Sequence, residues 1–235
     1  MKRIFLLLAI AGAYEAYGQG TTTVNYSAIP TSNRVIPTLA RGLPINSLKY
    51  SGITGSPYFS ETWMKGSLSS SDGTEYGTVL VRLDLLENSL IYLGANREEL
   101  TPVIPVSKVS LRDTTTGKTY LFANSSSIAG SNSEAIWYQV LSSGKATLYK
   151  QFSKNLNETK SSYGSAEVER SIRTEERYFI GINNTVTRVK KFKDIINLVP
   201  GKSQELSDYI EKNNLNGKKE SDFVLAVDYY NSITK

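Results

Sequence analysis

The middle of the chain alternates between hydrophobic and polar positions, with the period of two that half-buried strands show. The segment Tyr58–Leu93 predicts three antiparallel strands joined by tight turns at Asp72-Gly73 and Glu87-Asn88. Its clearest stretch is Thr78–Leu85, in which four aliphatic side chains share one face. Arg82 and Asp84 fall on the opposite face.

Similar segments follow as far as Val189, and turn signals separate them. The predicted strands are Glu99–Val103, Val106–Arg112, Lys118–Ala123, Ala135–Leu141, Ala146–Phe152, Glu169–Ile182 and Thr185–Val189. Pro102 restricts the first of these to an edge or an end of the sheet, and Glu169–Ile182 is either a strand pair or one long bent strand. The polar stretches Asn124–Glu134 and Asn155–Ala166 are predicted loops.

At Lys190 the hydrophobic period changes from two to about 3.6, which is typical of helices. Phe192–Val199, Ser203–Asn213 and Lys218–Ile233 are predicted short helices, which must pack their apolar stripes on the sheet to be stable. The expected fold class is therefore mainly β (α+β). Residues 56–189 would form an antiparallel meander, a curled sheet or an open barrel, and the short helices of 190–235 would pack on it.

The amino terminus has the three parts of a secretory signal peptide. Lys2 and Arg3 precede the apolar segment Ile4–Ala13, and Ala16-Tyr17-Gly18 supplies small residues for cleavage after Gly18. Residues 1–18 would therefore be removed, and 19–55, rich in Thr, Ser, Pro, Asn and Gly, would form an extended, partly disordered arm. We expect an exported protein in the periplasm, at the outer membrane or outside the cell, and no transmembrane segment.

The chain contains no cysteine and no histidine. Thiol nucleophiles, disulfides and the commonest general base and metal ligand are thereby excluded. Glycosidases can work with two carboxylates, so an enzyme is disfavoured and not excluded. The pairs Glu167/Glu169 and Glu175/Glu176 are the candidates, although neighbouring arginines would neutralise them. We predict no catalytic residue, no metal site and no cofactor.

Two aromatic groups are candidate ligand-binding residues. Tyr58, Phe59 and Trp63 form the first group, and Trp137 and Tyr138 form the second. Each could pack in the core or act as a stacking platform for a ligand. Because successive side chains of a strand point to opposite faces, only one of Trp137 and Tyr138 is expected in the core.

A basic cluster made of Lys190, Lys191 and Lys193 is the third candidate. From Lys145 to Lys193 there are eleven Lys and Arg residues against five Glu and no Asp. Such an excess could attract anionic envelope glycan or lipid headgroups, or it could be ordinary solvation. Nucleic acid is not an expected partner of an exported chain.

Several sequence blocks form a recognisable pattern. The blocks are GSPYF at Gly55–Phe59, then Trp63, Gly66, Asp72-Gly73 and Asp84-Leu85, then WYQVLSSGKATLYK at Trp137–Lys150 and LAVDYYN at Leu225–Asn231. With these blocks the chain resembles a group of uncharacterised secreted Bacteroidota proteins over roughly residues 55–231. The resemblance implies export and a cell-envelope setting but no activity, ligand or catalytic residue.

The predicted function is that of an exported, non-enzymatic binding or envelope-associated protein, with another envelope protein as a further possible partner. One alternative is a carboxylate-based hydrolase of envelope glycan, and another is a structural partner in an outer-membrane assembly. A cleft with two unpaired carboxylates would favour the hydrolase. A basic or aromatic surface would favour binding, and a long unpaired edge strand would favour assembly.

Overall fold

The computed structural model describes residues 42–46, 48–131, 135–160, 168–199 and 201–234, which belong to one compact unit, Ile36–Lys235. The described strands are β1 (Gly42–Pro44), β2 (Met64–Ser70), β3 (Glu75–Asp84), β4 (Ser89–Leu93), β5 (Glu99–Pro102), β6 (Val106–Arg112), β7 (Thr119–Asn124), β8 (Trp137–Ser142), β9 (Ala146–Lys160), β10 (Val168–Ile182) and β11 (Thr185–Val189). The helices are α1 (Phe192–Leu198), α2 (Ser203–Lys212) and α3 (Glu220–Ile233), and a 3-10 turn covers Ser125–Ser127.

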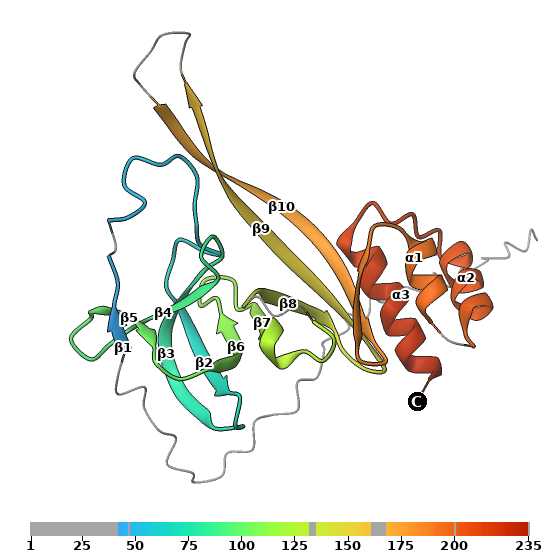
Figure 1. Cartoon of the computed structure of the whole chain (residues 1–235). Coiled ribbons are helices and arrows are strands. Elements are labelled where there is room, and N and C mark those ends of the chain that lie inside the picture. Colours follow the sequence, from blue (N-terminus) through green and yellow to red (C-terminus); the bar gives the residue numbers. More distant parts are fainter. Residues whose placement is uncertain (1–41, 47, 132–134, 161–167, 200, 235) are drawn as a thin grey trace, which may run out of the picture. The chain divides into compact units, whose positions relative to one another are not determined.

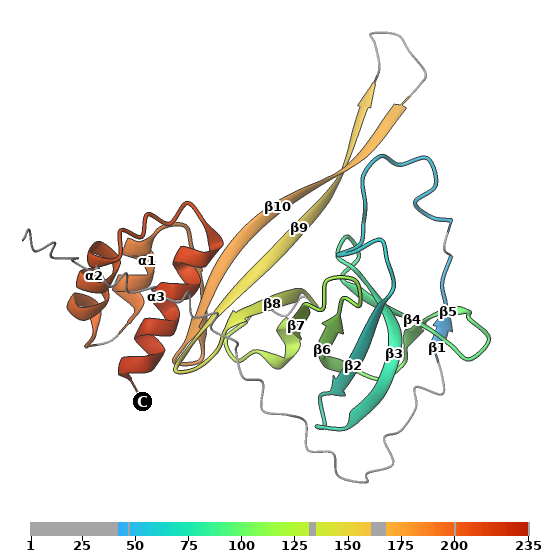
Figure 2. The same cartoon turned by 180° about the vertical axis from the view of Figure 1, so that it is seen from behind.

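All described strands belong to one antiparallel sheet in the order β1-β5-β4-β3-β2-β6-β7-β8-β9-β10-β11 (Figures 1 and 2). The sheet consists of two meanders that meet where β6 pairs with β2. Its first and last strands do not pair, so it is open. The predicted mainly β fold with short carboxy-terminal helices is confirmed.

The β1–β6 end of the sheet must be curled. Three residues join β5 to β6, so the step from Pro102 to Val106 can span at most about 15 Å. In a flat sheet, four strand spacings of about 4.8 Å would separate these two strands, about 19 Å in all. The chain can make this connection only because β2 to β5 bend back over one face.

An apolar cluster fills the inside of this curl. Leu68 and Val81 are fully buried, and Phe122 reaches the cluster from β7. The predicted aliphatic face of Thr78–Leu85 supplies Val81, Leu83 and Leu85. The other buried members are Met64, Leu90, Tyr92, Val109, Leu111 and Trp137.

The three helices cover the other end of the sheet, on β8 to β11. Ile195, Leu206 and Ala226 are each fully buried there, one from each helix. They pack against Ile180 of β10 and Leu148 of β9. The change of period at Lys190 therefore correctly predicted three helices that dock on the sheet.

The two apolar clusters occupy one face of the sheet. Phe122 pairs across the strands with Gln139, Gln139 with Lys150, and Lys150 with Tyr178. Directly paired residues of neighbouring strands share a face. The row therefore begins in the curl and ends beneath the helices, with the polar side chains of Gln139 and Lys150 between the two clusters.

The predicted loop Asn155–Ala166 is wrong where the structure describes it. β9 continues to Lys160, β10 begins at Val168, and the residues between them lie outside the described part. Both faces of this part of the hairpin are largely wet, so its residues lack the alternation that marks a half-buried strand. Glu169–Ile182 lies within a single long strand, one of the two alternatives.

Truncation of Phe223 should unfold the protein more easily, because this buried ring stacks on Tyr178 at 5.3 Å and contacts Phe192 at 5.3 Å. We expect Phe223→Ala to lower the free energy of unfolding by about 3–5 kcal/mol. Leu225→Ala removes an exposed side chain from the same helix and should cost about 0.5 kcal/mol or less. Urea unfolding followed by circular dichroism would compare them, and equal losses would contradict this packing.

Candidate functional site

A segment before β2, residues 48–59, crosses the sheet and is called the strap here. Its second half pairs with the end of β3: the Phe59 N–H donates to the Leu83 carbonyl and the Leu85 N–H to the Pro57 carbonyl, both at 2.8 Å. This half of the strap therefore continues the sheet along β3, and its Tyr58 lies opposite Asp84, on the face that carries Arg82 and Asp84.

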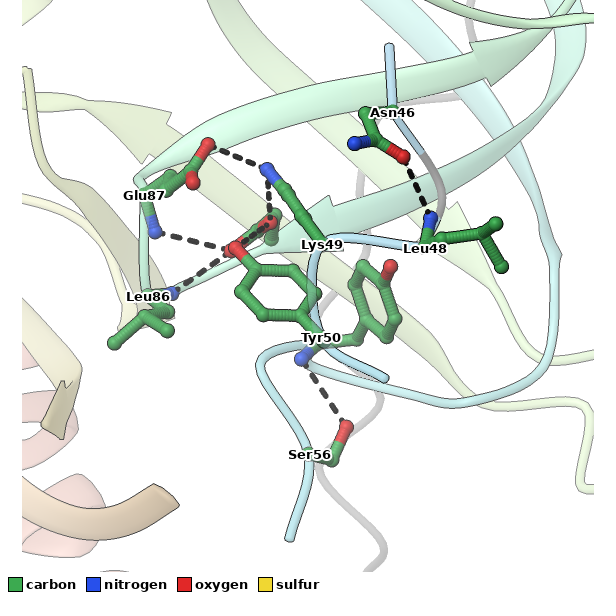
Figure 3. A network of polar contacts seen from close by, with 9 residues as sticks. Asn46, Leu48, Lys49, Tyr50, Ser56, Leu86 and Glu87 are labelled. Carbon is green, nitrogen blue, oxygen red and sulfur yellow. Dashed lines mark hydrogen bonds and ion pairs between the residues drawn. The ribbon is translucent and has the colours of Figure 1, made fainter. Parts of the chain in front are cut away.

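Asp84 is the centre of the contacts under the strap, and it has no exposed surface. Its Oδ1 accepts the backbone N–H groups of Leu86 and Glu87, both at 3.0 Å. Its Oδ2 accepts the Tyr50 hydroxyl at 2.7 Å and lies 3.4 Å from Lys49 Nζ. Figure 3 shows Lys49 and Tyr50 meeting the β3–β4 turn at Leu86 and Glu87. Lys49 also pairs with Glu87, so both strap residues hold this turn.

The strap also binds the β9–β10 hairpin. The Thr54 N–H donates to the Arg170 carbonyl at 2.9 Å, and the Ile172 N–H donates to the Thr54 carbonyl at 2.8 Å. Gly55 has a φ of +91°, and a Cβ there would lie 2.7 Å from the Ile172 carbonyl oxygen. Glycine is therefore required, because only it combines this φ with so close an approach.

The first aromatic group is divided between the strap and the core. Arg82 lies over the rings of Tyr58 and Trp63, at 4.5 and 4.1 Å from their centroids, and 3.6 Å from Glu99. Tyr58 is only 8% exposed, and Trp63 is half-buried. Phe59 packs edge-on against three rings of the curl: Tyr120, Phe122 and Phe152. The group is thus a packed contact, not an open stacking platform.

Trp137 and Tyr138 are both buried, at 3% and 4% exposure, although they point to opposite faces of β8. The expectation that only one of them could be core is wrong. Trp137 belongs to the curl, whereas Tyr138 packs against Tyr149 and Phe179 on the other face. The segment that follows β7 reaches across the sheet, since a Cβ on Gly130 would overlap the Asn184 carbonyl. No pattern in the sequence predicts that this segment lies beside Tyr138.

The predicted basic residues are the most exposed of the candidates. Lys190, Lys191 and Lys193 flank Phe192, and a Cβ at Gly217 would lie 3.4 Å from the Phe192 ring. The segment with the exposed Lys218 and Lys219 therefore meets the segment 190–193. We call these five residues the lysine surface: Lys190, Lys191, Lys193, Lys218 and Lys219.

The carboxylates next to the lysine surface already have other partners. Asp194 accepts the backbone N–H groups of Lys190 and Lys191, and the first of these bonds is the main reason that its pKa is lowered. Asp222 accepts the Gly217 N–H at 3.0 Å. Glu220 pairs with Lys150 at 2.9 Å. Among the described residues, none of the five lysines forms an ion pair.

The candidate carboxylate pairs do not converge on a reaction site. Glu175 bonds to Arg177 at 2.7 Å, and Glu176 pairs with Lys150 at 2.9 Å. Glu167 lies outside the described residues, and Glu169 is exposed. Among the described residues there is also no group of three or more acidic side chains that could hold a metal ion.

Two open cavities lie beside β9. One of about 370 Å³ is lined by Lys154 and Arg177 together with Tyr138 and Phe179, next to the β3–β4 turn. The other, of about 440 Å³, is lined by Tyr149 of β9 and by the β10–β11 turn at Asn184. This second cavity is also lined by two lysines, Lys108 and Lys145, that form no ion pair among the described residues, whereas the lysine surface gathers five. The lysine surface is therefore the better candidate for an anionic ligand.

The sequence blocks behind the resemblance meet in pairs. Gly55–Phe59 forms the second half of the strap and pairs with the Asp84-Leu85 end of β3. In the second pair, the Asn231 amide of α3 accepts the Ala146 N–H at 2.8 Å and donates to its carbonyl at 2.9 Å. A Cβ at Gly144 would lie 2.6 Å from the Asn231 side chain. These blocks therefore hold elements of the fold together.

No protein-family model, curated protein or solved structure matches the chain. In the part of the chain that the structure describes, no helix is long and apolar enough to cross a bilayer.

The Asp84 contacts predict a loss of stability at high pH. Burial, and then the hydrogen bond to Asp84, raise the Tyr50 pKa above its ordinary 10.0. Burial lowers the Lys49 pKa, but Glu87 and Asp84 more than offset this and keep it above 10.5. Both groups hold their protons more tightly in the folded state than in the unfolded state. Their contribution to the free energy of unfolding is therefore complete below about pH 10 and declines as the pH rises above it. Unfolding free energies from pH 8 to 12 should fall less steeply in Tyr50→Phe than in the wild type, and identical slopes would contradict this role.

Proposed function

We propose that this is an exported binding protein of the cell envelope that holds an anionic envelope glycan against its lysine surface. The observation behind this proposal is the exposure of five lysines from two meeting segments, none of which forms an ion pair among the described residues. The nearby Asp194 and Asp222 accept backbone N–H groups, and Glu220 pairs with Lys150. Asp194 still interacts electrostatically with Lys190 and Lys191, but the five lysines leave this surface with an excess of positive charge. A polymer with repeated carboxylates or phosphates can contact several of these lysines at once. Each contact is weak, but together they give a higher affinity.

Export rests on the charged, apolar and small-residue parts of residues 1–18. We expect cleavage after Gly18, so that Gln19 becomes the first residue. Intact-mass measurement of the protein from its native cells would test this, and a protein that keeps Met1 would contradict it.

Charge reversal of the predicted cluster should weaken glycan binding. The variant Lys190→Glu/Lys191→Glu/Lys193→Glu should lose most of its affinity for a carboxylated polysaccharide such as polygalacturonate in calorimetry. Its melting temperature should hardly change, because exposed charges contribute little to stability. Wild-type affinity should also fall as salt is added, since the Debye length is about 8 Å at physiological ionic strength.

A matched control reverses the same number of exposed lysines elsewhere, in Lys65→Glu/Lys108→Glu/Lys118→Glu. The net charge changes equally, so a general electrostatic effect would weaken both variants alike. Such a result would rule out the lysine surface. Stronger binding to vesicles with anionic headgroups than to the polysaccharide would instead identify a lipid ligand.

A further inference from the structure

The far half of the β9–β10 hairpin runs on past its neighbours (Figures 1 and 2). β8 pairs with β9 only as far as Gln151, and β11 pairs with β10 only from Tyr178 onward, whereas β9 continues to Lys160. No described strand pairs with the outer edge of β9 beyond Gln151. On the opposite edge, the strap meets β10 at a single bridge, Thr54 with Ser171. A hairpin with so little support is marginally stable in water, so this half would gain from a further strand.

The strap shows which backbone groups of β9 face outward. Its hydrogen bonds use the Arg170 carbonyl and the Ile172 N–H, so these groups point away from β9. Backbone groups of successive residues alternate in direction, so Ser171 between them faces β9 and its partner there, Asn157. On β9 the same alternation makes the backbone N–H and C=O groups of Lys154, Leu156 and Glu158 point toward the unpaired edge.

The sequence of this edge is complementary to itself. A two-fold axis through Leu156 places Lys154 of one copy opposite Glu158 of the other. By symmetry this pair of opposite charges forms twice in the dimer. Asn155 then lies opposite Asn157, and the two Leu156 side chains meet. We propose that two copies of this chain associate through the outer edges of β9, antiparallel and centred on Leu156, to form a continuous four-stranded ribbon.

The side chains of this edge favour a second copy as the partner. Leu156 is 43% exposed and would be covered by its symmetry mate. Lys154 has no carboxylate partner among the described residues; its Nζ donates to the Ser56 carbonyl at 2.7 Å, and burial lowers its pKa. Glu158 pairs with Arg170 at 2.9 Å, so the partner's Lys154 would extend an existing ion pair. Opposite charges across a strand pair stabilise it, whereas like charges oppose it.

Sedimentation equilibrium of the mature chain tests the dimer, which should appear as a concentration-dependent association. Lys154→Glu and Glu158→Lys each place like charges opposite one another, so each should weaken the dimer by more than about tenfold. The double variant Lys154→Glu/Glu158→Lys restores opposite charges and should recover association. A wild type that stays monomeric, or a double variant no better than the singles, would overturn the proposal.

Proline substitutions separate the dimer contact from the fold of the hairpin. Leu156→Pro removes an outward N–H, which an edge strand tolerates. It should give a monomer with an unchanged circular dichroism spectrum. Asn157→Pro removes an N–H that faces β10 and should disturb the hairpin itself. Association of Leu156→Pro as strong as that of the wild type would exclude this edge.

A cysteine probe tests the register, because the chain has no cysteine of its own. Residues directly opposite in a hydrogen-bonded pair have Cα atoms about 5.5 Å apart, which a disulfide can bridge. Leu156→Cys should therefore form a covalent dimer under mild oxidation, and Thr116→Cys, at an exposed turn, should not. Equal cross-linking of the two would show random collision and contradict the proposed register.

Discussion

One buried carboxylate, Asp84, determines how the amino-terminal half of this protein is held together. It binds two backbone N–H groups of the β3–β4 turn and, from the strap, the Tyr50 hydroxyl and the Lys49 ammonium. A buried charge is costly unless it is paired and hydrogen-bonded. The strap is therefore fixed over β3 at the position where it meets those needs, and its following residues reach both the core and the β9–β10 hairpin.

Polar contacts of the same kind join the helices to the sheet. Lys150 stands between the two apolar clusters and is shared by Glu176 of β10 and Glu220 of α3. Burial lowers its pKa, but these carboxylates more than offset that effect, so its pKa is raised. At the far end of α3, Asn231 takes both backbone groups of Ala146. The helices are thus positioned by directional contacts at both ends of α3 and by apolar packing between them.

These contacts explain why the chemistry-bearing residues look structural. Charged side chains form ion pairs that hold elements together, as in Arg82, Asp84, Lys150 and Glu176. The buried aromatic residues pack in the curl or on the opposite face of the sheet. The lysine surface and the outer edge of β9 differ, because the described residues leave their charges or backbone groups unmatched. The glycan proposal rests on the first feature and the dimer proposal on the second. The two proposals stand independently, since one concerns the helical end and the other the far half of the hairpin.

The sequence by itself determined most of the strands, the three helices and the exposed Lys190, Lys191 and Lys193, because a repeating pattern reports which side chains face a core. It could not determine what covers the second face of a strand. Nothing in the sequence therefore showed that Asp84 and Tyr138, on the second face of their strands, would both be buried. Residues distant in sequence cover them: Tyr50 contacts Asp84, and Phe179 contacts Tyr138. The continuation of β9 to Lys160 was missed for the converse reason: a strand with both faces wet has no pattern. Only the tertiary structure supplied these facts, since pairing across the sheet joins residues whose spacing in the sequence carries no period.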